Sequence, residues 1–244
     1  MRLHRFYVDK PITDETFDVN DRDLIAQWRS VFRYNVGSQV VLFDGSGVDY
    51  LCMITSLRNL GATVSIIKKT KNDFVPSCEL WLCVGIIKKD NFELVVEKAT
   101  ELGVLHIVPI LCDRSEKKNI NMERLQKIAI ESSEQSGRGD VPVIHEIINL
   151  SMLLMSKSPF DIMPKEKIVL QLNSRYIGDF LEKQPLEASS GRMTKLAVFI
   201  GPEGGWSDNE LKDFALHNIP SVSLGHQILR TETASIAVSS LLLL

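Results

Sequence analysis

The sequence predicts an α/β protein of two domains, with a β-rich domain at residues 1–73 and a domain at residues 74–244 built on a mainly parallel sheet. Three observations predict this class. Short apolar runs joined by glycine turns fill the first part of the chain, and a polar stretch follows at residues 70–77. Beyond it, apolar strands alternate with amphipathic helices, which is typical of a parallel sheet covered by helices.

The first domain is expected to contain four strands and one helix. Residues 5–8, 39–43, 48–56 and 62–69 are short apolar runs, and the turns DGSG (44–47) and NLG (59–61) separate the last three. Residues 21–33 place apolar side chains on one helical face, namely Leu24, Ile25, Trp28, Val31 and Phe32. Strands this short, joined by glycine turns, favour a small barrel or a curled sheet.

The second domain is expected to contain strands at residues 79–85, 106–111, 141–144, 167–172, 195–200 and 221–224. Helices should lie between them. We expect Asp90 to cap a helix that ends at Gly103, and Asn121 to cap one that ends near Gly137. Ser207 and Glu210 have the spacing of a capping box, and a last helix should begin at about Thr233.

Composition gives little support to a dedicated nucleic-acid binder, because the net charge is −3. Contacts with RNA would therefore need a local basic face. Residues 236–244 are too short to cross a bilayer, and the opening MRLHRFYV lacks the apolar run of a signal peptide, so we expect a soluble cytoplasmic protein that binds no membrane. Cysteines at 52, 78, 83 and 112 form no CxxC pair, which predicts free buried thiols and no metal site.

Three segments follow apolar strands, where an open parallel sheet binds its ligands. The turn at residues 201–205, GPEGG, lets a ligand approach the main chain, although a plain tight turn is an equal alternative. Arg230 precedes the last helix, whose N-terminus already carries partial positive charge, so a ligand role is favoured over an ion pair with Glu232. Thr231 or Thr233 would cap that helix. Cations at residues 113–118 and at 138 could meet phosphate or simply be solvated.

These segments carry a resemblance to a known family. The motifs are RFYV (5–8), LFDGSG (42–47), EKATELGV (97–104), RS (114–115), EQSGR (134–138) with VP (141–142), IGPEGG (200–205), LG (224–225) and ILRTETA (228–234). In this order they span nearly the whole chain. The sequence resembles the ribosomal RNA small-subunit methyltransferase E family of the SPOUT superfamily, whose members make N3-methyluridine in 16S RNA.

The resemblance implies a PUA-like RNA-binding barrel, a SPOUT domain with a deep trefoil knot, and a homodimer. It implies S-adenosyl-L-methionine as cofactor, small-subunit ribosomal RNA or the assembled subunit as substrate, and Arg230 as the catalytic residue that stabilises negative charge on the base. The implied cofactor-binding residues are Leu172, Ile200, Gly201, Pro202, Glu203, Gly204, Gly205, Leu224, Gly225, Ile228, Leu229 and Thr233. The candidate RNA contacts are Arg2, Arg5, Arg22, Arg114 and Arg138.

Two positions depart from the family pattern. Gln227 stands where the family commonly has Arg, which removes a charge beside the cofactor loop, and Ser38 stands where Asp is common. Two other functions are kept as alternatives. One is an RNA-binding protein that keeps the fold without catalysis, and the other is a nucleotide-binding Rossmann enzyme, although the chain lacks the GxGxxG fingerprint.

Overall fold

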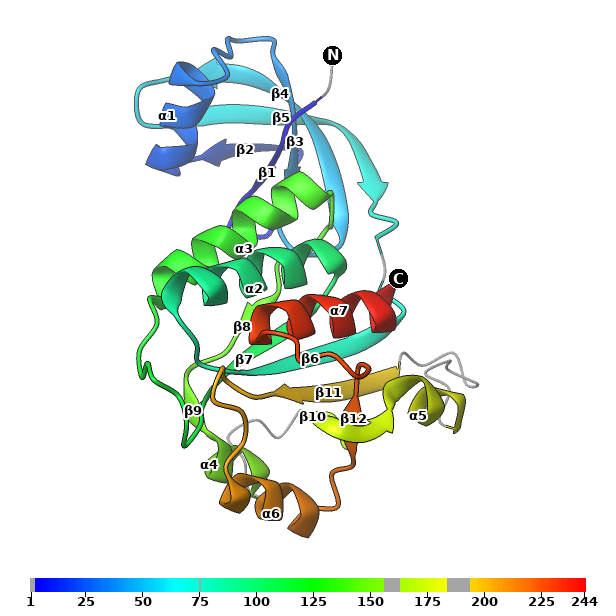
Figure 1. The fold of residues 1–244 in the computed structure, drawn as a ribbon. Coiled ribbons are helices and arrows are strands. Elements are labelled where there is room, and N and C mark those ends of the chain that lie inside the picture. The colour runs from blue at the N-terminus through cyan, green and yellow to red at the C-terminus, as the bar shows by residue number, and fades with distance from the viewer. Residues whose placement is uncertain (1–2, 75, 156–162, 184–193) are drawn as a thin grey trace. The chain divides into compact units, whose positions relative to one another are not determined.

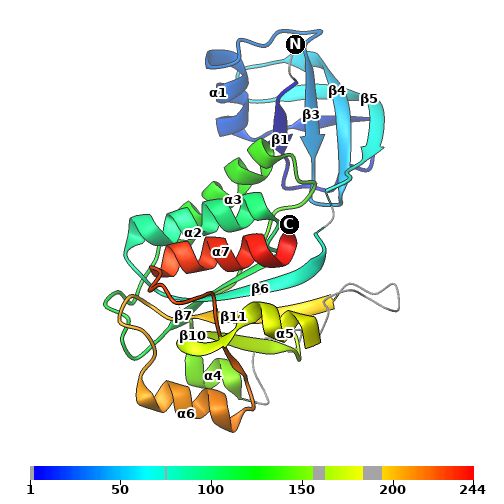
Figure 2. The same ribbon diagram turned by 45° about the vertical axis from the view of Figure 1, so that its right-hand side comes forward.

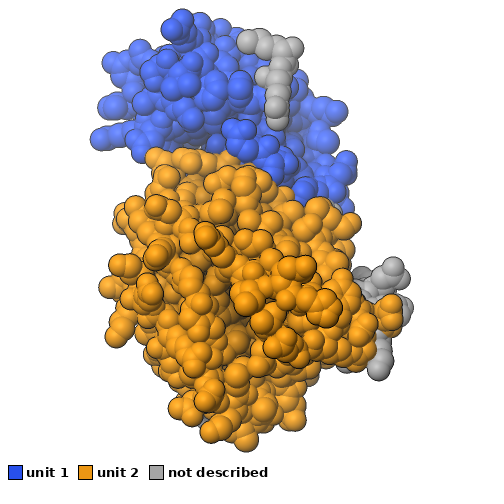
Figure 3. Space-filling model, viewed as in Figure 1, with its two compact units in different colours: residues 1–75, 133–141 blue, residues 76–132, 142–244 orange. Residues whose placement is uncertain are grey.

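The computed structural model describes residues 3–74, 76–155, 163–183 and 194–244. The chain divides into two compact units, residues 1–75 with 133–141 and residues 76–132 with 142–244 (Figure 3). The sequence predicts the boundary between residues 73 and 74, with residues 133–141 in the second domain. In the structure this segment packs with the first unit, where the side-chain Nδ2 of Asn72 donates to the carbonyl of Gly137 at 2.9 Å. A contact between residues so distant in the chain has no periodic signature in the sequence.

The first unit is a curled five-stranded sheet in the order β1-β3-β4-β5-β2. Its strands are β1 (Arg5–Tyr7), β2 (Thr16–Val19), β3 (Gln39–Phe43), β4 (Val48–Leu57) and β5 (Ala62–Lys71). β1 pairs with β3 in parallel and the remaining pairs are antiparallel. Four of these strands were expected. β2 was not predicted, and its burial pattern leaves only Val19 fully covered.

The helix α1 (Arg22–Ser30) supplies much of the core of this unit. Trp28 and Ile25 are fully buried, and the rings of Phe6 and Trp28 lie 5.6 Å apart. Asp21 caps the helix by accepting from the backbone amides of Asp23 and Leu24. The amphipathic spacing of the sequence therefore places the predicted apolar face against the sheet.

The second unit is built on a parallel sheet in the order β12-β10-β11-β6-β7-β8, with β9 also paired to β7. The strands are β6 (Cys78–Gly85), β7 (His106–Leu111), β8 (Val143–Ile144), β9 (Ile148–Asn149), β10 (Lys167–Tyr176), β11 (Thr194–Ile200) and β12 (Ser221–Ser223). Every pairing in this sheet is parallel, which confirms the expected α/β class. β9 was not predicted.

Helices cover both faces of this sheet (Figures 1 and 2). α2 (Lys89–Leu102) and α7 (Thr231–Leu243) pack side by side on one face, while α4 (Leu150–Leu154) and α6 (Asp208–Leu216) lie on the other. α3 (Met122–Ser136) continues from this unit into the segment that packs with the first, and α5 (Ile177–Lys183) follows β10. α4 and α5 were not predicted. None of the helices described is both long and apolar enough to cross a membrane.

The helix ends test the predicted caps. The Asn121 side chain accepts from the amide of Arg124 at 3.0 Å, and Gly103 ends α2 with a φ of +101°, both as expected. The expected starts of two helices, α2 and α7, were wrong. α2 begins after Lys88 rather than after Asp90, so Asp90 lies in the first turn and favours the helix dipole.

The start of α7 was placed too late, because Arg230 is its N-cap and no side chain caps it. Thr231 does not cap the helix either. Its hydroxyl donates to the carbonyl of Gly201 at 2.8 Å instead.

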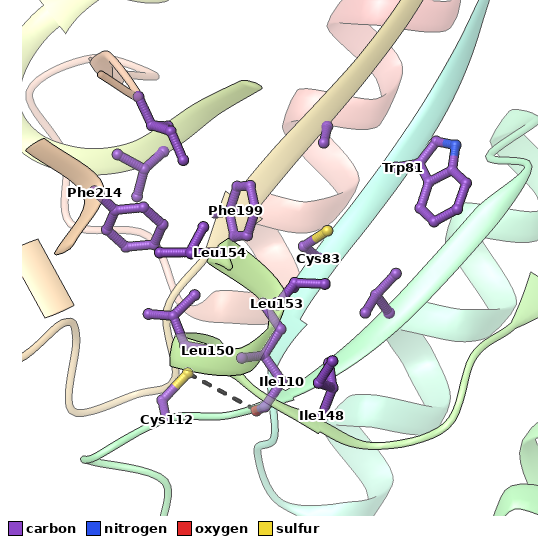
Figure 4. Close-up of a cluster of buried hydrophobic side chains, with 14 of the residues drawn as sticks. Trp81, Cys83, Ile110, Cys112, Ile148, Leu150, Leu153, Leu154, Phe199 and Phe214 are labelled. Atoms are coloured by element: carbon purple, nitrogen blue, oxygen red, sulfur yellow. Dashed lines mark hydrogen bonds between the residues drawn. The ribbon is translucent and has the colours of Figure 1, made fainter. Parts of the chain in front are cut away.

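The core between the sheet and the helices α4 and α6 is closely packed (Figure 4). Phe199 of β11 contacts Phe214 of α6 with ring centroids 5.3 Å apart, and Leu150 and Leu153 of α4 complete the cluster. Each large apolar side chain buried in this way contributes about 1.5–3 kcal/mol. All four cysteines are buried and free, as predicted. Burial raises the pKa of Cys52 to about 12 and that of Cys78 to about 11, so neither thiol is reactive near neutral pH.

Candidate functional site

A cavity of about 480 Å³ lies where β10, β11 and β12 end or bulge in the second unit. Three segments far apart in the sequence line it, namely residues 170–172, 200–206 and 223–231. The strands β11, β10 and β12 are neighbours in the sheet (Figure 1), so their carboxyl ends bring these segments together. The volume falls in the range of about 300–1,000 Å³ that small-molecule and cofactor sites occupy.

The turn at residues 201–205 forms one wall of the cavity. A Cβ on Gly85, at the end of β6, would lie 2.6 Å from the nitrogen of Pro202, so β6 and the turn touch through their backbones. Gly205 has a φ of +67°, a conformation that other residues resist, and its amide donates to the carbonyl of Pro202 at 2.8 Å. Gly205 therefore serves the turn itself, and Gly85 of β6 permits the close approach of main chain to main chain.

The loop between β12 and α7 forms the opposite wall. Gly225 has a φ of +139°, which redirects the chain after β12. The hydrogen bond from Thr231 to Gly201 joins the start of α7 to the turn at residues 201–205. The two walls are thus fastened to each other at one end of the cavity.

An irregularity of β10 supplies the third side. The register of β10 against β12 shifts between Leu170 and Arg175, so the residues between them leave the regular ladder. Asn173 lies in this stretch with a φ of +60°. The indole of Trp206 donates to the carbonyl of Leu170 at 3.0 Å and ties the stretch to the turn at residues 201–205. Backbone groups that no longer pair within the sheet thereby become available beside the cavity.

A buried carboxylate holds the turn from outside the cavity. Glu210 is 4% exposed, and its two oxygens accept from the amides of Asp113 at 2.9 Å and Ser207 at 2.7 Å. The Ser207 hydroxyl in turn donates to the Asp113 carboxylate at 2.6 Å and accepts from the Glu210 amide. The predicted capping box is present. It also connects the loop after β7 to the residues that follow the turn.

Arg230 is the cation of the cavity lining. It is exposed at the N-terminus of α7, and within the part of the chain that the structure describes its guanidinium has no hydrogen-bond or ion-pair partner. The described residues show no ion pair between Arg230 and Glu232, whose side chain is buried at 7% exposure. A free guanidinium beside a helix N-terminus, at the edge of an apolar cavity, favours an anionic or polarisable ligand.

The structure gathers most of the predicted cofactor residues around this cavity. Those that line it are Leu172, Ile200, Gly201, Pro202, Glu203, Gly205, Leu224, Gly225, Ile228 and Leu229. Gly204 does not line it, since its Cα faces Arg114, whose Cβ is 3.0 Å from the Cβ position of residue 204. Thr233 does not line it either and is exposed one turn along α7.

Several lining residues were not predicted, which are Leu170, Gln171, Trp206, Leu211, Ser223, Thr231 and Ala234. Some had a usable signal. Trp206 follows the glycine turn directly, and Thr231 and Ala234 share one face of α7 by their spacing. Leu211 had none, because its contribution depends on how α6 packs. Gln227, which was expected beside the cofactor loop as a departure from the family pattern, does line the cavity.

The candidate RNA contacts fall into different surroundings. Arg22 is exposed, and Arg2 lies outside the described residues. Arg114 is exposed too, although one of its guanidinium nitrogens donates to the carbonyl of Gly204 at 3.1 Å. Arg5 is engaged within the first unit, where it pairs with Asp49 at 2.6 Å.

Arg138 departs from the sequence expectation. Its side chain is fully buried and pairs with Asp140 at 2.8 Å, and its guanidinium lies 5.8 Å from the centre of the Phe74 ring. A buried guanidinium that loses its ionic partner destabilises the fold. The pairing of the buried Arg138 with Asp140 therefore supports a structural role for Arg138 rather than contact with RNA. Among the described residues, no group of three or more His, Cys, Asp or Glu side chains is arranged to hold a metal ion.

Solved structures with the same architecture include two that are bound to S-adenosyl methionine. The ribosomal RNA small subunit methyltransferase E of Neisseria gonorrhoeae, bound to S-adenosyl methionine, is 27% identical and has a TM-score of 0.82 over 98% of this chain and 96% of its own. A Legionella pneumophila protein in complex with the same cofactor is 25% identical, with a TM-score of 0.85 over 99% of this chain and 97% of its own.

Sequence comparison gives the same result. The ribosomal RNA small subunit methyltransferase E of Rickettsia conorii is 29% identical over 97% of this chain and 93% of its own length. The corresponding protein of Bacillus subtilis is 28% identical over 84% and 81%. The family model of the RNA methyltransferase domain matches residues 75–243, which are most of the chain and nearly all of the second unit. The chain therefore belongs to the RNA methyltransferase family and is a relative of the ribosomal RNA small subunit methyltransferases E.

Proposed function

We propose that the protein transfers a methyl group from S-adenosyl-L-methionine to N3 of a uridine in small-subunit ribosomal RNA. The observation that carries this proposal is the cavity at the ends of β10, β11 and β12, with the unpaired guanidinium of Arg230 at its edge. Two structural relatives are bound to this cofactor, which supports the same ligand for this chain. The substrate would be the ribosomal RNA or the assembled subunit, in the cytoplasm.

The residues present fit such a ligand. The cavity combines apolar side chains with backbone groups of the turn at residues 201–205 and of the loop at residues 224–229, which suits an adenosine and its ribose. S-adenosyl-L-methionine supplies an electrophilic methyl group on a sulfonium. Catalysis by the chain would then consist of positioning the two reactants and of stabilising negative charge on the uracil as its N3 loses a proton. Arg230 is our candidate for that electrostatic role.

We infer further that the second unit carries the trefoil knot of the SPOUT class and that the first unit is a PUA-like RNA-binding domain. Arg22 of the first unit and Arg114 of the second are proposed as RNA contacts. A homodimer is part of the proposal. Leu172, Ile228 and Leu229 are 40%, 84% and 37% exposed beside the cavity, and exposed apolar side chains gathered in this way are typical of a protein interface. A second copy of the chain would cover them and close the site to water.

The experiment is transfer of labelled methyl from S-adenosyl-L-methionine to purified small ribosomal subunits that lack the modification, followed by nucleoside analysis. We expect label in N3-methyluridine. Arg230→Ala should lower the rate about 10²–10³-fold, the usual effect of removing a group that stabilises developing charge, while cofactor affinity changes little. Lys212→Ala, which removes an exposed cation from α6 away from the cavity, is the matched control.

Three outcomes separate the alternatives. Label in another nucleoside would refute the uridine N3 assignment but keep the reaction. Cofactor binding without any transfer would point to a different RNA substrate. The absence of both would refute the enzyme and favour an RNA-binding protein that keeps the fold without catalysis.

A further inference from the structure

A second cavity, of about 270 Å³, lies within the first unit. Residues 3–6 around β1 and residues 134–137 at the end of α3 line it, together with Gln27 of α1 and Phe32 just after that helix. These two stretches include parts of the RFYV and EQSGR motifs, and neither stretch contributes to the lining of the first cavity. The proposed cofactor site therefore leaves these two motifs without a function.

One side of this cavity is a fixed aromatic surface. Phe32 is partly exposed, and its ring stacks on Tyr34 with centroids 5.4 Å apart and planes 12° from parallel. Phe6 contacts the same ring edge-on at 5.3 Å, and the imidazole of His4 lies 4.4 Å from it. Three neighbours therefore hold the ring of Phe32 in place. Rings held in this way are the surfaces on which proteins stack unpaired bases.

Two exposed side-chain carboxamides lie beside the aromatic surface. The side chains of Gln27 and Gln135 are exposed, and neither has a hydrogen-bond partner in the part of the chain that the structure describes. Each carboxamide offers donors and an acceptor together, which is the combination that the edge of a nucleobase requires. The hydroxyl of Ser136 is shielded from solvent and is also without a partner among the described residues. Unpaired polar groups beside an aromatic ring indicate a polar, flat ligand.

The charges of the cavity exclude a phosphate as its main ligand. Arg5 lies at the cavity, but one of its guanidinium nitrogens pairs with Asp49 at 2.6 Å and also donates to the carbonyl of Arg138 at 3.2 Å. The other donates to the carbonyl of Ser133 at 3.4 Å. Glu134 adds a carboxylate to the lining. A site whose cation is neutralised and which carries its own anion suits a neutral base rather than the backbone of a nucleic acid.

We propose that this cavity binds one unpaired nucleobase of the RNA substrate, stacked on Phe32 and hydrogen-bonded by Gln27 and Gln135. The proposal rests on the proposed function in one respect, that the substrate is RNA. It adds a place where the first unit holds a base other than the reacting uridine. Such a contact selects single-stranded segments over duplexes, because a paired base cannot enter the cavity.

The test measures the affinity for two fluorescein-labelled oligomers of equal length by anisotropy at a fixed salt concentration. One is a short single-stranded RNA of mixed sequence, and the other has the same ribose-phosphate backbone without bases. We expect the wild-type protein to prefer the RNA with bases. The double variant Gln27→Ala/Gln135→Ala should weaken its binding about tenfold, the effect of losing two hydrogen bonds, and should leave the abasic oligomer unaffected.

Two further variants make the result specific. Gln39→Ala removes an exposed carboxamide of β3 that is outside the cavity and without a side-chain partner in the described chain, and it should bind as the wild type does. Phe32→Leu removes the stacking surface and should also reduce the preference for bases, with thermal unfolding as the check that the variant folds. The double variant changes exposed side chains only, so its result stands even if Phe32→Leu is unstable.

The proposal would be overturned if the wild type binds both oligomers equally or binds neither, or if the double variant behaves as Gln39→Ala does. The proposal would also be overturned if the double variant bound the intact small subunit more weakly but bound the RNA oligomer as the wild type does, because the cavity would then hold part of a ribosomal protein. Cofactor affinity, measured in the same preparations, keeps the two proposals apart. Its absence in the wild type would refute the methyltransferase function while leaving the oligomer result in force.

Discussion

The buried carboxylate of Glu210 offers a quantitative test of how the turn at residues 201–205 is held. Its oxygens accept from the amides of Asp113 and Ser207, so the side chain joins the loop after β7 to the start of α6. In Glu210→Gln the side chain keeps its shape but exchanges one oxygen for an NH2 group. Whichever way the carboxamide turns, one of the two backbone amides then faces a donor and loses its partner.

The magnitude follows from the burial of the site. Glu210 is 4% exposed, so solvent cannot replace the lost acceptor. A hydrogen bond to a charged group contributes about 1.5–3 kcal/mol, and a buried donor left unpaired costs about 1–3 kcal/mol. We expect the free energy of unfolding of Glu210→Gln to fall by roughly 2–4 kcal/mol in urea titrations. The turn at residues 201–205 would be less ordered in this variant, so cofactor binding would have to order it. Cofactor affinity, measured by calorimetry, should fall about tenfold for each 1.4 kcal/mol that this ordering costs.

Asp208→Asn is the matched control for this variant. It removes one negative charge from the same first turn of α6, but Asp208 is exposed and is not part of the network. Its loss should cost only about 0.3–1 kcal/mol through the helix dipole. If Glu210→Gln is no less stable than Asp208→Asn, or if its cofactor affinity equals that of the control, the argument that Glu210 holds the turn is refuted.

Two other predictions concern contacts at the ends of strands. In Gly85→Ala the new Cβ would lie 2.6 Å from the nitrogen of Pro202, so we expect a loss of about 1–3 kcal/mol in urea unfolding and weaker cofactor binding, and wild-type affinity would contradict the close contact. Burial and the neighbouring His145 lower the pKa of His106 from 6.5 to about 4, so the unfolded chain binds its proton first as the pH falls. Titration of His106 therefore leaves the free energy of unfolding unchanged above about pH 6.5. As the pH falls toward 4 it lowers that free energy by roughly 1–3 kcal/mol, once solvent screening is allowed for. Unfolding of His106→Phe should depend less steeply on pH between 7.5 and 5, and an unchanged slope would disprove it.

Much of the fold could be predicted because its elements carry local patterns. The strand at residues 39–43 and the amphipathic face of α1 follow from side-chain spacing, and Gly103 and the Ser207–Glu210 box mark helix ends by their own chemistry. The missed elements are short and lack such patterns. β9 has two residues and α4 has five, and both are stable only because the sheet and α6 cover them.

The division of the chain could not be predicted for a related reason. Residues 133–141 pack with the first unit through hydrogen bonds such as that from the amide of Tyr7 to Glu134 at 2.9 Å. Nothing in the local sequence reports a partner more than a hundred residues away. The burial of Arg138 depends on the same packing, which is why an arginine in a glycine-containing loop suggested contact with RNA and proved to be internal.

The cavity at the ends of β10, β11 and β12 shows how far spacing can go in defining a site. Glycines and an arginine after apolar strands are enough to place two of its segments, residues 201–205 and 224–230, at one edge of a parallel sheet, because all strands of such a sheet end on the same side. The third predicted segment, residues 113–118 with Arg138, does not line the cavity, and Leu172 was expected only from the family resemblance. The sequence alone does not settle whether Arg230 is free, because the same sequence would allow Arg230 to form an ion pair with Glu232. That question is decided by α7, which buries Glu232 against the unit and leaves the guanidinium at the cavity. Packing of one helix face thus keeps the charge of Arg230 available to a ligand, and Arg230→Ala is the variant in which that availability can be measured.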